Sequence, residues 1–321
     1  MVNMWWIKRI IATVLLTFAA ICSILAQDSR TVFNFLRLPA SAHVSALGGD
    51  NITLTEDDAS LVFHNPALIN SVSDRTLNLN AMSYMQGSVT ASASFTKALN
   101  YRATWSAQGR FISYGEMKEM TSLGEQTGTF SARDVALGGT FAYSLTNRIN
   151  GGITAKLVGS FIGQYSSLGA CVDLGLNYFD PASQWSISAV ARNLGGQLSA
   201  YEDDFEPVPL DLQVGVSKRL IGSPLRFSAT LVRLNDWQYG IGKHLVIGAD
   251  LLLGQQFYVA AGYNPLRSAQ MKISDGDGES SHGVALSLGA GMRLERLQLH
   301  VAYAKYHVSS TSLMFSFSYT L

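Results

Sequence analysis

The last nine residues, LMFSFSYTL (residues 313–321), alternate strictly between two kinds of side chain. One face of an extended chain would carry Leu313, Phe315, Phe317, Tyr319 and Leu321, and the other Met314, Ser316, Ser318 and Thr320. Because successive side chains of a strand point to opposite faces, this alternation predicts a β-strand with one apolar and one polar surface. The same period recurs in VALGGTFAYSL (135–145) and HGVALSLGAGMRL (282–294), and no stretch after residue 75 has a convincing 3.6-residue period. The sequence therefore predicts an all-β protein.

Turn signals divide the chain after residue 75 into about fourteen strand candidates. They begin near Arg75, Ser88, Arg102, Ser131, Ile149, Gln164, Ser183, Val208, Pro224, Lys243, Gln256, Ser281, Arg296 and Ser310. Strands of soluble proteins usually have about 5 to 6 residues, whereas a tilted strand needs about 9 to 11 to cross a membrane. Most candidates reach or exceed the membrane length. Their length favours a transmembrane β-barrel over a soluble secreted β-protein, which remains the alternative.

The connections between the candidates give independent support. Four long connections, at about 114–130, 195–207, 235–242 and 265–280, all follow odd-numbered candidates, while the even-numbered candidates end in tight turns. Outer-membrane barrels have long loops outside and short turns in the periplasm. We therefore expect an antiparallel barrel of about fourteen strands at residues 75–321, with its C-terminus on the periplasmic side.

The composition agrees with a chain whose surface faces lipid. Only 14% of the residues are charged, against about 25% in ordinary soluble domains. The formal net charge is zero, which argues against nucleic-acid binding because such proteins need a basic stripe.

Residues 1–26 have the pattern of a signal peptide. Lys8 and Arg9 precede an apolar run from Ile10 to Ala26, and polar residues follow. An N-terminal membrane anchor is the alternative, although the run is short for a hydrocarbon core of about 30 Å. We expect cleavage after Ala26 and export out of the cytoplasm. Cys171 is then the one remaining cysteine, so an internal disulfide is excluded.

The sequence offers no catalytic or metal-binding motif. The six histidines form no HExxH-like pair and no Cys/His spacing, and no GxSxG element is present. DGDGES (275–280) resembles part of a calcium loop but lacks the twelve-residue pattern, and YEDDFEP (201–207) is a second acidic stretch. We interpret both as exposed loops, and we expect neither an enzyme nor a cofactor.

A segment before the first strand candidate, at residues 27–74, needs a different explanation. Its central part, ALGGDNITLTEDDASLVFHNPALIN (46–70), is too apolar for a solvated tail. A barrel of about fourteen strands has a lumen too wide for its own side chains to fill, so the segment is predicted to be a hatch inserted there. Its shape would depend on the residues Gly48 and Gly49 for a bend, Asp57 and Asp58 for capping, and Asn65, Pro66 and Ala67 for a turn.

The same elements resemble a known group of proteins. ALGG (46–49), EDDAS (56–60) and NPA (65–67) are similar to the hatch signature of the FadL-like outer-membrane barrel superfamily. The form FNFLRLPASAHVSALGG with FHNPALIN most resembles the PorQ side of the PorV/PorQ family, which belongs to the Bacteroidetes type IX secretion system. The resemblance is strongest at residues 32–70 and extends over the rest as general architecture.

The resemblance implies a FadL-like fourteen-stranded barrel with an N-terminal hatch in the outer membrane of a Gram-negative bacterium. It also implies a non-enzymatic role as the anchor of a cell-surface attachment complex. The expected partners are a PorZ-like extracellular protein, a PorU-like sortase, a PorV-like barrel, and outer-membrane lipid with the lipopolysaccharide that receives secreted cargo. No catalytic residue and no cofactor are implied.

Under this interpretation the long loops face the partners. The residues proposed for this surface are Glu116, Lys118, Glu119, Tyr201, Asp203, Asp204, Phe205, Trp237, Tyr239, Asp275 and Asp277. The competing hypothesis is a FadL-type transporter of hydrophobic small molecules, which would need an apolar external groove and a lateral opening. The mainly polar long loops favour the scaffold.

Overall fold

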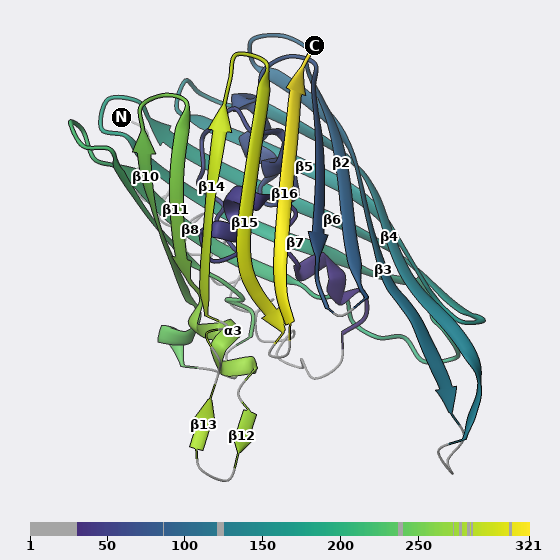
Figure 1. Ribbon diagram of the computed structural model, residues 1–321. Coiled ribbons are helices and arrows are strands. Elements are labelled where there is room, and N and C mark those ends of the chain that lie inside the picture. Colours follow the sequence, from purple (N-terminus) through teal and green to yellow (C-terminus); the bar gives the residue numbers. More distant parts are fainter. Residues whose placement is uncertain are drawn as a thin grey trace, which may run out of the picture.

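The computed structural model describes residues 31–85, 87–120, 125–236, 240–271, 273–275, 278–280, 283, 285–307 and 310–321. In this part of the chain, fourteen antiparallel strands close into one barrel (Figure 1). Each strand pairs with its neighbours in the chain, and β1 closes the barrel by pairing with β16, from Thr76 with Thr320 to Met82 with Met314. The predicted fold class is therefore confirmed. The predicted signal peptide lies outside the described residues.

The barrel strands begin close to the predicted positions. They are β1 Thr76–Ser83, β2 Val89–Ala98, β3 Ala103–Met120, β4 Gln126–Ser144, β5 Ile149–Ile162, β6 Tyr165–Asp180, β7 Trp185–Ser199, β8 Asp211–Arg219, β9 Leu225–Leu231, β10 Leu245–Leu253, β11 Phe257–Tyr263, β14 Leu286–Arg293, β15 Leu297–His307 and β16 Ser310–Thr320. Two short strands, β12 Ile273–Asp275 and β13 Gly278–Ser280, form a separate hairpin beside the helix α3 Pro265–Gln270, and η4 Ile241–Lys243 is a 3-10 turn.

The two ends of the barrel differ as the connections predicted. The connections after β3, β7, β9 and β11 lie at one end, here called the long-loop end, where α3 and the β12–β13 hairpin project (Figure 1). The connections after β2, β4, β6, β8, β10 and β14, and the C-terminal Leu321, lie at the opposite, short-turn end. Among the described residues, no helix has the length and hydropathy of a membrane span.

One predicted loop is wrong. Most of the stretch 114–130 is not a loop but the continuation of β3 and β4, which stay paired from Glu116–Ser131 to Met120–Gln126. The β2–β3 pairing ends at Val89–Ser113 and the β4–β5 pairing at Ala132–Ile162, so neither neighbour accompanies this extension. Gly115 lies in a bulge between Ser113 and Glu116, and the pairing of β3 with β4 resumes beyond it. We call residues 116–120 and 126–131 the β3–β4 ribbon.

The alternating side chains lie on the two faces that the sequence predicted. Phe315 is 56% exposed on the outer wall, whereas its neighbour Met314 faces the lumen and is 2% exposed. Leu137, Leu157 and Leu176 are likewise exposed on the outside. A barrel surrounded by lipid requires an apolar outer belt, with polar residues above and below it. The lumen side is lined by small polar side chains and by the residues that meet the N-terminal segment.

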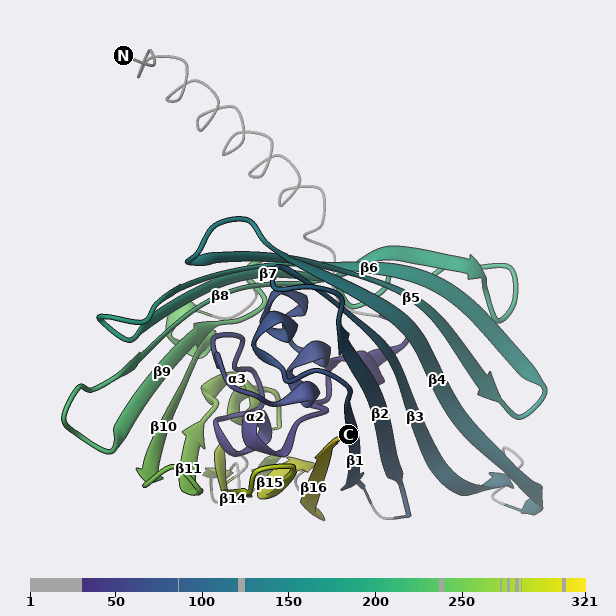
Figure 2. The same cartoon turned by 90° about the horizontal axis from the view of Figure 1, so that it is seen from above.

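The N-terminal segment from residue 31 to residue 75 fills the lumen (Figure 2). It forms short helical turns, η1 Asn34–Arg37, α2 Ala42–Ala46, η2 Ala59–Phe63 and η3 Pro66–Ser71. The helix α2 packs on β11, β14, β15 and β16, and η3 packs on β3 to β6, so the segment contacts opposite walls. Its buried leucines and alanines pack against Met82, Ala260, Ala302 and Met314 of the wall and form the core of the molecule. We call residues 31–75 the hatch.

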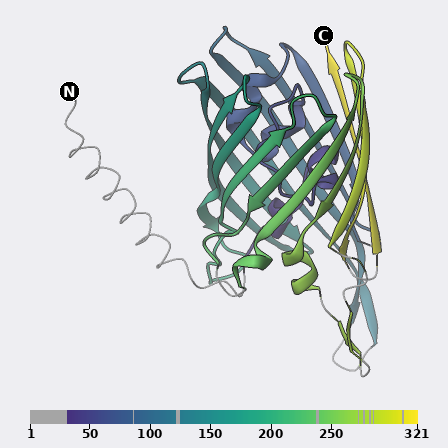
Figure 3. The same ribbon diagram turned by 90° about the vertical axis from the view of Figure 1, so that its left-hand side faces the viewer.

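The hatch threads the barrel from one end to the other (Figure 3). At the long-loop end, the backbone N–H of Val32 donates to the carbonyl oxygen of Pro207, which lies in the connection between β7 and β8. At the short-turn end, the side chain of Asn70 donates to the Ser144 hydroxyl, and β1 then begins at Thr76. The described chain therefore enters the lumen at the long-loop end and leaves it at the short-turn end.

Glycines of the wall lie where the hatch backbone comes closest. A Cβ atom on Gly152 would lie 2.4 Å from the carbonyl carbon of Pro66, and one on Gly262 would lie 2.2 Å from the backbone nitrogen of Gly48. Contacts this short are not found between real side chains, so only glycine fits at these two positions. The wall and the hatch are thus matched in shape on opposite sides of the lumen.

Candidate functional site

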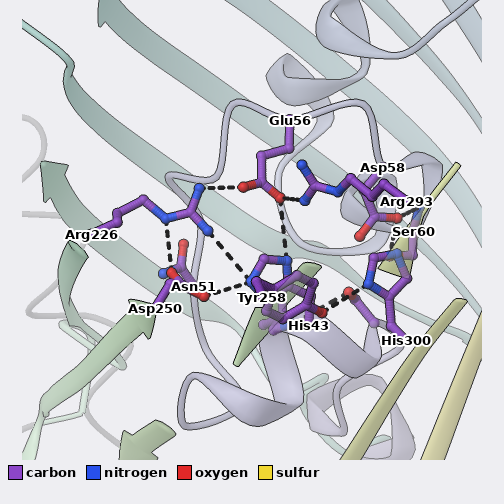
Figure 4. A network of polar contacts seen from close by, with 12 residues as sticks. His43, Asn51, Glu56, Asp58, Ser60, Arg226, Asp250, Tyr258, Arg293 and His300 are labelled. Carbon is purple, nitrogen blue, oxygen red and sulfur yellow. Dashed lines mark hydrogen bonds and ion pairs between the residues drawn. The ribbon is translucent and has the colours of Figure 1, made fainter. Parts of the chain in front are cut away.

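A cluster of charged side chains joins the hatch to the wall (Figure 4). It consists of His43 and Glu56 from the hatch, Arg226 from β9, Asp250 from β10 and Arg293 from β14, and we call it the hatch–wall cluster. The Glu56 carboxylate bridges the two guanidinium groups, accepting from Nη1 of Arg226 and from Nη2 of Arg293. The Nε of Arg226 also donates to Asp250 at 2.8 Å. One hatch carboxylate therefore ties two separate strands together.

The charges of the cluster balance. Arg226 and Arg293 carry two positive charges, and Glu56 and Asp250 carry two negative charges. Burial lowers the pKa of the His43 imidazole, while the Asp250 carboxylate opposes this shift. Both ring nitrogens of His43 face carboxylate oxygens, Nε2 at 2.7 Å from Asp250 and Nδ1 at 3.3 Å from Glu56. Buried ions are tolerated when each is paired in this way, and removal of one partner is costly.

Aromatic side chains hold the imidazole in place. The ring of Tyr258 stacks on His43 with 3.9 Å between the ring centroids and an interplanar angle of 22°. The Tyr258 hydroxyl and Nδ1 of His300 are 2.8 Å apart, so these two side chains of β11 and β15 share a hydrogen bond. His300 is buried on the lumen face of β15 and supports Tyr258 and His43.

The two glycines of the predicted hatch motif form the bend at the long-loop end of α2. Gly48 and Gly49 have φ angles of +101° and +95°, which side-chain-bearing residues rarely adopt. The Gly48 carbonyl accepts from Nδ2 of Asn264 at 3.0 Å and from the Arg267 guanidinium. The bend is thus fixed by side chains that belong to the long-loop end of the wall.

The acidic and NPA residues shape the second half of the hatch. Asp58 caps η2 by accepting from the backbone N–H of Ser60 at 2.9 Å, whereas Asp57 accepts from the backbone N–H of Ser73 at 2.7 Å, where the hatch leads into β1. Asn65 caps η3 by accepting from the N–H of Ala67, and Pro66 stands at the start of that turn. The motif residues contact backbone and wall, and they do not meet at one chemical centre.

Sequence reasoning missed the hatch–wall cluster. His43 and Glu56 were visible but were not linked to any partner. The available signal was a charged residue at a lumen-facing position of a barrel strand, as in LRFSATL for Arg226 and GADLLL for Asp250. In the part of the chain that the structure describes, no group of three histidine, cysteine, aspartate or glutamate side chains has a metal-binding arrangement.

The hatch divides the lumen into two polar cavities. A cavity of about 400 Å³ at the short-turn end borders the cluster at Glu56, Arg226 and Arg293. A second cavity of about 640 Å³ opens at the long-loop end between the hatch, α3 and the connections after β7 and β9. Between them, Arg110 donates to the Leu38 carbonyl at 2.6 Å and Arg192 donates to the Leu36 carbonyl at 2.9 Å. The hatch is thereby bonded to the β3 and β7 walls as well.

The predicted partner-facing residues lie at the long-loop end where the structure describes them. Glu116, Lys118 and Glu119 are exposed on the β3–β4 ribbon, and Asp203, Asp204 and Phe205 are exposed in the connection after β7. Tyr201 is partly buried, and its hydroxyl donates to Ser160 at 2.5 Å, so it supports the loop from below. Asp275 lies in β12. Trp237, Tyr239 and Asp277 lie outside the described residues.

A scan of protein-family models finds no match to the sequence, and a search of curated proteins finds none either. Solved structures are similar in fold. The toluene transporter TodX of Pseudomonas putida is 13% identical, with a TM-score of 0.58 over 88% of this chain and 98% of TodX. This chain has the fold of the FadL-type barrels. A FadL homologue of Pseudomonas aeruginosa is 11% identical with a TM-score of 0.54, over 87% of this chain and 97% of the homologue. The monoaromatic hydrocarbon channel CymD is 11% identical with a TM-score of 0.59, over 90% of this chain and 99% of CymD.

Proposed function

We propose that this FadL-fold barrel lies in the outer membrane of a Gram-negative bacterium and belongs to the PorV/PorQ family as a PorQ-like member. Its proposed role is that of a non-enzymatic anchor for the attachment complex of a type IX secretion system. The long-loop end then faces outward. The observation that carries the proposal is the fixed hatch. Bonds to the β3, β7, β9 and β14 walls and glycine contacts on opposite sides hold it. A barrel closed in this way suits a platform for other proteins better than a pore.

The β3–β4 ribbon supports a role in binding a surface protein. It projects beyond the neighbouring strands, and Met117 and Phe130 are opposite each other in its ladder. Apart from the Ser131 carbonyl, which accepts from the Gly163 N–H, neither β2 nor β5 pairs with it, so its two edges carry backbone groups available to a partner strand. The proposed partners are a PorZ-like extracellular protein in direct contact, with a PorU-like sortase and a PorV-like barrel in the same complex, which attaches cargo to lipopolysaccharide.

Purification of the tagged barrel from solubilised outer membranes tests the anchor. We expect a stoichiometric extracellular protein to co-purify, and we expect it to be lost when residues 116–131 are replaced by a two-residue turn. In the matched control, the short turn 221–223 at the other end is replaced instead. We expect this variant to retain the co-purifying protein. A barrel that purifies from its native membrane without any surface protein would refute the anchor role.

One observation favours a transporter as the second candidate. TodX and CymD are named as a transporter and a channel of aromatic hydrocarbons, and this chain shares their fold. On its outer wall, an apolar groove of about 730 Å³ lies over Ala290 of β14 and is bordered by Phe315 and Phe317. An assay of toluene uptake into vesicles that contain the barrel separates the two candidates. A transporter must take up toluene, whereas an anchor need not. Fatty acid bound to the purified protein would also favour transport.

A further inference from the structure

The cavity at the long-loop end is a built site rather than a gap between loops. We call it the cup, and its volume is about 640 Å³, within the range of small-ligand pockets. Its wall combines four parts of the chain: Asp50 from the hatch, Glu206 from the connection after β7, Arg233 from the connection after β9, and Arg267 from α3. Tyr84 and Tyr306 complete it. The described residues alone therefore enclose a site that opens to the side of the long loops.

Arg267 is held rigidly and has a vacant hydrogen-bond donor. Its side chain is 6% exposed, and its guanidinium lies over the Tyr306 ring at 4.2 Å from the centroid. Nη2 donates to the Gly48 carbonyl, and the backbone N–H donates to Oδ1 of Asn264 at 3.1 Å. Nη1 is buried without a hydrogen-bond partner. A buried charged donor that lacks an acceptor is costly, and Arg267 borders the cup, so an acceptor oxygen of a ligand there would stabilise its guanidinium.

A carboxyl group lies beside this donor. Nδ2 of Asn264 donates to the Gly48 carbonyl at 3.0 Å and to Oδ2 of Asp50 at 3.3 Å. Because Oδ1 of Asn264 accepts from the Arg267 N–H, Asn264 contacts both Asp50 and Arg267. Burial raises the pKa of Asp50, and the nearby Asp211 carboxylate raises it further. The Asp50 carboxyl therefore accepts hydrogen bonds when ionised and donates one when protonated.

The charges of the cup favour a neutral ligand. Its lining has three basic and four acidic side chains, which are Arg37, Arg233, Arg267, Asp50, Glu206, Asp211 and Asp236. Such near balance gives a strong anion or cation no advantage. Polar and charged side chains outnumber apolar ones in the lining, so the aromatic or aliphatic anchor of a peptide would find a less dry pocket than it needs. A ligand with many hydroxyl groups meets both kinds of partner, because each hydroxyl donates and accepts.

We propose that the cup binds a neutral saccharide, with the Arg267 guanidinium donating to a sugar oxygen and Asp50 bonded to a neighbouring hydroxyl. The half-buried Tyr84 ring offers an apolar face to the sugar. This inference goes beyond the proposed anchor role and does not depend on it, since a saccharide and a partner protein can be tested separately on the same preparation.

Calorimetric titration of the full-length barrel tests the proposal. The protein is purified in lauryldimethylamine oxide, because detergents with sugar headgroups would compete for the cup. The neutral probes are maltotriose, mannotriose and chitotriose, the anionic probe is sialyllactose, and the peptide probe is acetylated tri-alanine amide. We expect at least one neutral trisaccharide to bind with a Kd below about 1 mM and both other probes to fail. Binding of sialyllactose or the peptide alone, or of no probe, would overturn the proposal.

Two variants and one control place the binding in the cup. Gln270→Trp, on the exposed side of α3, fills the cup without removing a hydrogen bond to the hatch, and we expect it to abolish binding. Arg267→Lys keeps the charge but loses the planar fork, and we expect at least a tenfold weaker Kd. Gln256→Trp makes the same change in the short-turn cavity and retains the wild-type Kd. A wild-type Kd for the saccharide in Gln270→Trp would exclude the cup as its binding site. This result decides the question even if Arg267→Lys fails to fold.

Discussion

The fit of the hatch against β5 can be tested with a single methyl group. In Gly152→Ala, the new Cβ would lie 2.4 Å from the carbonyl carbon of Pro66 and 2.6 Å from the backbone nitrogen of Ala67. Carbon atoms in contact normally lie about 3.5 to 4.0 Å apart, so the overlap exceeds roughly 1 Å. The atoms that are struck belong to the backbone, and no change of rotamer can relieve the clash. We expect this overpacking to cost about 1–3 kcal/mol of the free energy of unfolding.

Gly139→Ala is the matched control on the adjacent strand β4. Its Cβ would have no neighbour within 4 Å, and alanine is favoured over glycine within a strand by roughly 0.5–1 kcal/mol. The two variants carry the same added atom, yet they should differ by about 1.5–4 kcal/mol. Urea unfolding in lipid vesicles, followed by tryptophan fluorescence, measures both midpoints. Equal midpoints with equal m-values would refute the close seating of the hatch on this wall.

Three further outcomes follow from the same contacts. Phe317→Arg on the lipid face should cost about 2–4 kcal/mol in vesicles, whereas Met120→Arg on the ribbon should cost nothing measurable, and equal costs would mean that the facing is wrong. Glu56→Gln leaves the partly buried Arg293 without a carboxylate and Arg226 with Asp250 alone, and should cost about 3–5 kcal/mol, while Glu202→Gln in an exposed loop should be silent. Burial holds the pKa of His64 well below its usual value, and Nε2 accepts from the Ala40 N–H. The unfolded chain therefore binds the extra proton, so stability should be full above about pH 6.5 and fall as the pH drops below it. His64→Gln should make this fall smaller in unfolding curves between pH 7 and pH 5, and the buried His43 should account for part of what remains.

Much of the barrel could be predicted because the alternation of side chains in a membrane strand is visible in its own sequence. The alternation in LMFSFSYTL specifies both the strand and its two faces, and Phe315 and Met314 lie on the faces that it predicted. The ends of β3 and β4 were less predictable. A glycine such as Gly115, at φ +78°, marks a turn in most sequences, but here it lies in a bulge within a strand that continues to Met120. Whether such a glycine ends a strand depends on the pairing across the ladder.

The hatch–wall cluster could not be predicted from local patterns. Glu56 lies 170 residues from Arg226 and 237 residues from Arg293 along the chain. These side chains meet only because the register of the closed barrel and the path of the hatch place them at one height. Single-sequence patterns report strands and turns, whereas a pairing over such separations is a property of the whole closed structure. The wall residues that contact the hatch could not be identified from its sequence.

The path of the hatch has a consequence for how the barrel can assemble. A segment that passes through the lumen from end to end cannot be inserted sideways once the seam between β1 and β16 has formed. Its backbone at Ala42 already depends on that last strand, since it donates to the Ser316 hydroxyl at 2.9 Å. The first and last parts of the chain must therefore come together before either is stable. Closure around a threaded segment makes assembly slow and all-or-none, because no shorter piece of this chain contains both the plug and the seam that retains it.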